Sequence, residues 1–169
     1  MSDLRFEILQ SGPILTGKGP EIVQAELDRA MELAVNLLLR EVKKDTPVGV
    51  RGAEGGLLST IQSDIIGKGT PVSIGIVATT SKYGRPVELG TKPHMPPSSA
   101  LVPWVKKFLG YEGKKADRVA FALAKAIAKR GTEGRYMFES AAMEKEDAVR
   151  RIFMKAGFEI SKKLGGVWL

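Results

Sequence analysis

The segment from Tyr83 to Pro97 constrains the fold of this chain more than any other stretch, because prolines fix the backbone at both of its ends. Its sequence is Tyr-Gly-Arg-Pro-Val-Glu-Leu-Gly-Thr-Lys-Pro-His-Met-Pro-Pro. Each proline restricts φ and biases the preceding residue toward extended conformations. Val87 and Leu89 alternate with Glu88 and Gly90, which is the period of a half-buried strand. The pattern predicts a short strand and a stiff loop that docks with little loss of entropy.

A long amphipathic helix is predicted upstream, from Pro20 to Lys44. Apolar residues recur there at steps of three or four positions. Pro20 suits the first helical position, and Glu21 suits the positive end of the helix dipole. Pro47, directly after Thr46, is expected to stop the helix.

An antiparallel hairpin is predicted from two β-branched stretches, Leu57 to Ile66 and Val72 to Thr79, on either side of a glycine-rich turn. The Val87 segment is expected to add a third strand. The alternating residues near the start of the chain, Leu4, Phe6 and Ile8, predict a further strand or a docking arm. The glycine-rich stretch from Gly49 to Gly56 is expected to be a flexible loop.

Three helices are predicted after the proline-rich segment. The first runs from Leu101 to Leu109 with Ser98 or Ser99 as its cap and Pro103 in its first turn. The second runs from Asp117 to Lys129 and is halted by Gly131. The third runs from about Phe138 to Lys163, and its predicted inward residues are Ala142, Val149, Ile152, Phe153 and Ile160. Tyr136 and Phe138 are expected to fill the core at the turn before it.

These elements predict an α+β fold, with the long N-terminal amphipathic helix and the C-terminal helices packed on a small antiparallel sheet of three to four strands. We expect an N-terminal arm and loop over residues 1–19, a single α+β domain over residues 20–164 with the flexible loop at 49–56, and a C-terminal tail over residues 165–169. The apolar fraction of 43% is sufficient for a sizeable core in a chain of 169 residues.

Few residues are suited to catalysis or metal binding. The chain has no cysteine and one histidine, His94, so disulfides, thiolate metal sites and cysteine nucleophiles are excluded. A hydrolase with His94 as general base and Glu88 as its orienting group is one hypothesis. A loop histidine that bonds the backbone or packs on Trp104 fits the sequence better. We therefore predict no enzymatic activity, no cofactor and no metal, and the apolar runs are too short to predict a membrane partner.

The net positive charge of the chain comes from residues 101–169. The first 100 residues hold 11 basic and 11 acidic residues, whereas the last 69 hold 15 and 8 and carry the whole net charge of +7. Such an excess is compatible with binding to DNA or to an acidic protein. It is also compatible with solvated helix faces, which is the interpretation we favour. The candidate contacts are Lys106, Lys107, Lys114, Lys115, Arg150 and Arg151.

Several short motifs follow one another in a fixed order. They are Thr46-Pro47-Val48 at the helix end, Gly56-Leu57-Leu58-Ser59, Tyr83 with Val87-Glu88-Leu89-Gly90-Thr91, Pro93-His94-Met95-Pro96-Pro97, the Leu101 to Val105 helix, and Ala126 to Thr132 before Phe138. In this order they resemble the minor tail-component, or tail-completion, proteins of long-tailed double-stranded DNA phages. The resemblance covers about residues 22–152. The chain departs from it in the glycine-rich insertion and in the N-terminal arm.

The resemblance implies a structural protein of the phage neck or head-proximal tail, located in the virion and, during assembly, in the host cytoplasm. Its partners would be other tail and neck proteins, such as the tail tube, the tail terminator, and a head-closure or connector protein, and it would form a homo-oligomeric ring. A basic, non-specific DNA-binding protein at the head-tail junction is the alternative. The residues expected to matter for assembly or structure are Thr46, Pro47, Tyr83, Glu88, Gly90, Thr91, His94, Pro96, Trp104, Gly131 and Phe138. Glu88 is expected to pair with a basic or backbone donor.

Overall fold

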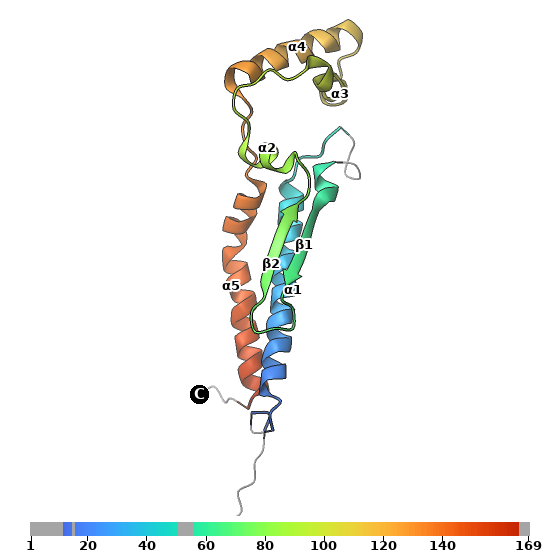
Figure 1. Ribbon diagram of the computed structural model, residues 1–169. Helices are drawn as coiled ribbons and strands as arrows, with labels where there is room; N and C mark the ends of the chain where they lie inside the picture. The colour runs from blue at the N-terminus through green and yellow to red at the C-terminus, as the bar shows by residue number, and fades with distance from the viewer. Residues whose placement is uncertain (1–11, 15, 51–55, 166–169) are drawn as a thin grey trace, which may run out of the picture. The chain divides into compact units, whose positions relative to one another are not determined.

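The protein is described by a computed structural model that covers residues 12–14, 16–50 and 56–165. These residues contain helices and one antiparallel two-stranded sheet (Figure 1). The elements are, in order, α1 (Gly19–Asp45), the 3₁₀ turn η1 (Leu57–Thr60), β1 (Ile61–Ile66), β2 (Ile74–Thr79), α2 (Gly84–Leu89), α3 (Ser98–Leu109), α4 (Gly113–Arg130) and α5 (Met137–Lys163). The mixed helix-and-sheet class is confirmed, but the described residues form two strands rather than three to four. The predicted N-terminal arm at Leu4, Phe6 and Ile8 lies outside the described residues.

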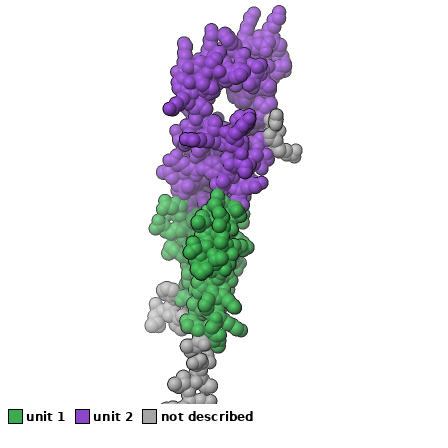
Figure 2. Space-filling view, in the orientation of Figure 1, with its two compact units in different colours: residues 1–37, 64–76, 146–169 green, residues 38–63, 77–145 purple. Residues whose placement is uncertain are grey.

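The chain forms two compact units, which Figure 2 shows in different colours. Unit 1 comprises the described parts of residues 1–37, 64–76 and 146–169, and unit 2 comprises those of residues 38–63 and 77–145. The helices α1 and α5 and both strands each contribute residues to the two units. Each unit has its own packing.

In unit 1, α1 lies directly against the hairpin. A Cβ atom added to Gly75 on β2 would come within 2.7 Å of the Met31 sulfur and 2.8 Å of a Val35 methyl, so glycine permits this close approach. At the tip of the hairpin, the Gly69 N–H donates to the carboxylate of Asp28, 3.0 Å away. Buried apolar residues of this unit are mostly small, and they are Ala30, Ala34, Val35 and Ala156.

Unit 2 holds two apolar clusters. The first is built from α1, β1 and α5, and its buried members are Val42, Ile61, Met137 and Ala141. The second lies between α3 and α4, where Val105 packs against Ala116 and Ala120. Because alanine lets helix backbones approach closely, this second cluster joins α3 and α4 into one helical pair (Figure 1).

The predicted strand around Val87 is wrong, because Gly84–Leu89 form the short helix α2. Pro86 is the third residue of this helix, where a backbone N–H has no acceptor within the helix, so the proline does not break it. The Val87 N–H donates to the Tyr83 carbonyl at 3.0 Å. Val87 packs on the first cluster whereas Leu89 is 55% exposed, so the two residues do not share one buried face as a strand requires.

The hairpin is confirmed with one change at its start. The first four residues of the predicted strand, Leu57–Thr60, form η1 instead. The hydroxyl of Ser59 donates to the Gly56 carbonyl at 2.8 Å, and that of Thr60 donates to the Leu57 carbonyl at 2.7 Å. Such local bonds favour a turn over an extended strand.

The helical predictions are confirmed in type and corrected in detail. The helix α3 begins at Ser98, so Pro103 lies in its second turn rather than its first. Pro97 takes the cap position, and no side chain bonds this end of the helix, so the predicted serine cap is wrong. The helix α4 begins four residues before the predicted Asp117 and ends, as predicted, before Gly131. On α5, Ala142 was predicted to face inward but is exposed, and the preceding residue Ala141 is buried.

Candidate functional site

Many of the motif residues meet where α2 approaches the start of α5. The Glu88 carboxylate accepts the N–H groups of Phe138 and Glu139, each at 3.1 Å. These are the second and third residues of α5, whose N–H groups have no acceptor within the helix. A carboxylate is also favoured at the positive end of the helix dipole. Glu88 therefore caps α5 from another element, which bears out the predicted pairing with a backbone donor.

Two antiparallel backbone bonds close the same region. The Thr91 N–H donates to the Thr132 carbonyl at 3.0 Å, and the Thr132 N–H donates to the Thr91 carbonyl at 3.1 Å. The two hydroxyl oxygens lie 2.9 Å apart. The segment after Gly131 then continues beside α2, where the Arg135 N–H donates to the Val87 carbonyl at 2.8 Å. We call the residues 87–91 and 131–139 the junction.

Glycines are required at the junction because the two backbones approach so closely. A Cβ atom on Gly90 would lie 2.2 Å from the Thr132 carbonyl oxygen, and one on Gly131 would lie 1.9 Å from the Thr91 carbonyl oxygen. Both glycines also have positive φ, 75° and 74°, a region that side chains disfavour. Tyr136 is the one non-glycine residue with positive φ, 51°, among the described residues.

The end of α1 reaches the junction through Thr46. Its buried hydroxyl donates to the Val42 carbonyl at 2.6 Å and lies 3.3 Å from the Met137 sulfur. Met137 is fully buried and Phe138 packs on the same cluster. Tyr136 is 46% exposed, so the prediction that it fills the core is wrong, and Met137 takes that place. Pro47 is half-buried after Thr46.

The remaining motif residues lie away from these contacts. Tyr83 precedes α2 and is exposed, and Pro96 is half-buried. His94 is exposed, and its Nδ1 lies 3.0 Å from the Lys92 carbonyl oxygen, so the predicted bond of a loop histidine to the backbone is confirmed. The rings of Trp104 and Phe108 are tilted by 33°, with centres 5.5 Å apart. His94 and Glu88 thus have different backbone partners, and the described residues contain no group of acidic, histidine or cysteine side chains suited to holding a metal ion.

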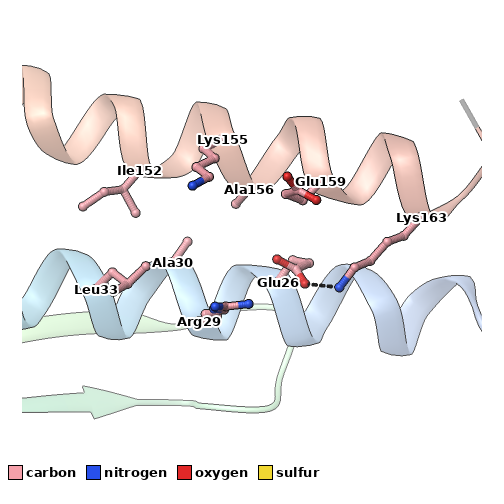
Figure 3. Close-up of a pocket in the computed structure, with 9 residues that line it drawn as sticks. All are labelled: Glu26, Arg29, Ala30, Leu33, Ile152, Lys155, Ala156, Glu159 and Lys163. Atoms are coloured by element: carbon pink, nitrogen blue, oxygen red, sulfur yellow. Dashed lines mark hydrogen bonds and ion pairs between the residues drawn. The ribbon is translucent and has the colours of Figure 1, made fainter. Parts of the chain in front are cut away.

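Unit 1 carries the groove drawn in Figure 3, which lies between α1 and α5 and has a volume of about 330 Å³. At one end Lys163 donates to the buried carboxylate of Glu26 at 2.5 Å. This bond lowers the pKa of Glu26 below its usual 4.5, against the burial that raises it. Arg29, Lys155 and Glu159 line the rest of the groove.

A similar ion pair lies in unit 2. The carboxylate of Glu41 accepts from Lys44 at 2.7 Å and lies 3.2 Å from the Lys145 ammonium. The bond from Lys44 is the main reason that the pKa of Glu41 lies below its usual 4.5, and Lys145 adds to it. The pairs Lys163–Glu26 and Lys145–Glu41 connect α1 with α5, one in each unit.

The basic excess is concentrated on α3 and α4. Residues 98–130 contain eight Lys or Arg against two Asp or Glu, a net +6 of the total +7. The predicted contacts are divided between the units: Lys106, Lys107, Lys114 and Lys115 belong to unit 2, and Arg150 and Arg151 belong to unit 1.

Four of these six residues have partners within the chain. Lys106 lies 3.2 Å from the Glu112 carboxylate, and Lys107 donates to the Val50 carbonyl at 2.8 Å. Lys115 lies over the Tyr111 ring, and Arg150 pairs with Glu146 at 3.1 Å.

Sequence reasoning missed several residues of the site. Thr132 and Gly134 belong to the junction, where a Cβ atom on Gly134 would lie 2.4 Å from the Glu88 carbonyl oxygen. The spacing of glycines around Thr132 was an available signal, but their partners lie about forty residues upstream and no local pattern names them. The chain matches no known protein-family model, no curated protein and no solved structure. No helix in the described part of the chain is both long and apolar enough to span a membrane.

Proposed function

We propose that this protein is a structural subunit of a phage neck, which completes the tail and prepares it to join the head. The proposal originates in the resemblance of its ordered motifs to tail-completion proteins. One observation carries it further. Five of the eleven motif residues lie in the junction, and they are Glu88, Gly90, Thr91, Gly131 and Phe138; the side chain of a sixth, Thr46, contacts it at Met137.

The role of these residues in the junction is architectural. The Glu88 carboxylate is bound by two backbone N–H groups, and the glycines permit backbone contact. Motif residues that hold backbone segments together are expected in a structural protein, whose role depends on its fold. An enzyme would instead bring together groups able to transfer a proton or attack a substrate.

Large apolar side chains on α3 supply a surface for assembly partners. Trp104 is 40% exposed, and Phe108 and Leu109 are similarly accessible. Aromatic side chains are enriched in protein interfaces. In the proposed role they would contact a second copy of the chain in a ring, or an adjacent tail tube, tail terminator, head-closure or connector protein.

Deletion of the gene from the genome that encodes the chain tests this function. Electron microscopy of the resulting lysate should show heads and tails that are assembled but not joined, and a plasmid copy should restore complete particles. A plasmid copy with Glu88→Ala should restore complete particles poorly. Glu133 has an exposed carboxylate in the segment 131–139, and a plasmid copy with Glu133→Ala should restore complete particles fully. Normal particles from the deletion would contradict the proposal.

A further inference from the structure

The exposed face of α4 carries a row of four basic side chains. Lys114, Arg118, Lys125 and Lys129 are all exposed and follow one another at spacings of four, seven and four residues, with Phe121 between them. Helical geometry places these positions on one side of α4. The buried residues Ala116, Ala120 and Ala124 lie on the opposite side. We call the four basic residues the basic stripe.

Acidic neighbours are missing from most of this stripe. Within α4, no Asp or Glu lies three or four positions from Arg118, Lys125 or Lys129. Two pairs four residues apart, Lys114 with Arg118 and Lys125 with Lys129, instead place like charges together, which destabilises a helix. Asp117 flanks only the start of the stripe.

The helix α5 shows what an ordinary solvated face looks like in the same chain. Arg150 pairs with Glu146 at 3.1 Å. Arg151 lies four residues after Asp147, and Lys155 and Lys162 lie four and three residues from Glu159. A solvated face of this kind interleaves the two signs, and the basic stripe does not.

We infer that the basic stripe binds the phosphate backbone of double-stranded DNA without reading its bases. The stripe spans about 22 Å along α4 at 1.5 Å per residue, which is long enough to contact several phosphates of one duplex turn. Lys and Arg on a helix surface are suited to phosphate contact. The inference depends on the face of α4 and not on the proposed role in assembly.

The chemistry of this face favours DNA over the other anionic partners. The cores of protein interfaces are depleted in lysine, yet lysine forms most of the stripe. A helix that inserts into a membrane surface presents an apolar face to the lipid, whereas the apolar face of α4 is covered by α3. The one aromatic ring in the stripe, Phe121, already has Lys125 over it at 4.7 Å.

Fluorescence anisotropy with a labelled 20-base-pair duplex tests the inference on the full chain. Binding should be measurable at 50 mM salt, and log K should fall linearly with the logarithm of the salt concentration. The triple variant Arg118→Gln, Lys125→Gln and Lys129→Gln should bind at least about tenfold more weakly and should reduce the slope by about 2.7.

The chain provides a matched control. The variant Arg151→Gln, Lys155→Gln and Lys162→Gln removes the same residue types from exposed positions of α5, so both proteins carry the same net charge. This control should keep the wild-type slope to within about one unit. A charge-preserving variant with Arg118→Lys, Lys125→Arg and Lys129→Arg should also keep it, which separates charge loss from a failure to fold.

Three results would overturn the inference. The first is no binding of the wild-type chain to the duplex at 50 mM salt. The second is an equal loss of affinity in the stripe variant and the α5 control, since binding would then follow net charge alone. The third is stripe-dependent binding to phosphatidylserine vesicles or to poly-glutamate but not to DNA, which would assign the stripe to a membrane or to an acidic protein.

Discussion

The junction and the basic stripe use polar groups in opposite ways. At the junction, the carboxylate of Glu88 and the backbone groups of Thr91 and Thr132 are bonded to one another. On the stripe, charged groups of one sign face the solvent without acidic neighbours on most of its length. The motif residues at the junction and the residues that we propose to bind DNA are therefore different sets. Substitutions at the junction should therefore affect stability, and substitutions in the basic stripe should affect binding.

The largest effect is expected from Gly131→Ala. Its Cβ would lie 1.9 Å from the Thr91 carbonyl oxygen, and the residue has a φ of 74°. The paired backbones would have to separate, so we expect a loss of roughly 3 kcal/mol or more in the free energy of unfolding, measured by urea denaturation.

Gly110→Ala is the matched control for this change. Gly110 has a φ of 68° but nothing within 4 Å of a Cβ atom, so only the backbone conformation opposes the substitution. We expect a cost of about 1 kcal/mol. Equal losses in the two variants would mean that close approach at the junction contributes nothing.

The next largest effect is expected from Glu88→Ala. The change removes the acceptor of two N–H groups at the start of α5, and losing a helix cap costs about 1 kcal/mol per bond. We expect a decrease of roughly 2 kcal/mol in thermal or urea unfolding, and about half of it for Glu88→Gln, which keeps one acceptor. Glu133→Ala should change stability by less than about 0.5 kcal/mol, and a similar loss there would contradict the capping role.

Acid should weaken the ion pairs of the buried residues Glu26 and Glu41, which lie outside both regions. The pKa values of Glu26 and Glu41 are lowered from 4.5 by their lysine partners. Their stabilisation is therefore complete above pH 4.5 and is lost as the pH falls through the folded-state values below it. Urea unfolding between pH 7 and pH 3 should show a steeper loss for the wild type than for Glu26→Gln.

Lys163→Met tests the same pair from the other side. Without Lys163, the main cause of the lowered pKa of Glu26 is removed, so this variant should also show a shallower acid dependence. A wild-type acid profile in both variants would show that the pair does not contribute to stability.

The smallest effect is expected from the stripe variant, and it has the opposite sign. Replacing Arg118, Lys125 and Lys129 by glutamine relieves like-charge repulsion, so the protein should become more stable by about 0.2–0.5 kcal/mol at low salt. The gain should disappear at 1 M salt because the charges are screened. Thermal unfolding of the stripe variant and of the α5 control measures this gain in stability. A loss of stability only in the stripe variant would mean that these three residues stabilise the fold.

The long helices could be predicted from the sequence because their signals are local. The apolar period of α1 and the proline after Thr46 mark its extent, and Gly131 marks the end of α4. The strand predicted at Val87 was wrong because two alternating residues do not distinguish a strand from a single helical turn. In the short helix that forms instead, Val87 packs on the first cluster.

The site was predictable in its members but not in its arrangement. Glu88 was expected to meet a basic or backbone donor, yet the donors lie about fifty residues away at Phe138 and Glu139. Such a distance carries no local signal. The spacing of the basic stripe, by contrast, is a local pattern in the sequence. The sequence does not show which lysines lie on the exposed side of α4, because this depends on Ala116 and Ala120 packing against α3.

The bridge between Thr91 and Thr132 has a consequence for how this chain could change. Directly paired residues on neighbouring strands have Cα atoms about 5 Å apart, a gap that a two-residue turn also spans. The two ends of the intervening segment, residues 92–131, are therefore held next to each other in unit 2. Recombination could exchange that segment for a longer, shorter or differently charged one while its paired ends stay in place, with the loss of the bond from Lys107 to the Val50 carbonyl. The bridge is therefore a point at which the binding specificity of the chain could change.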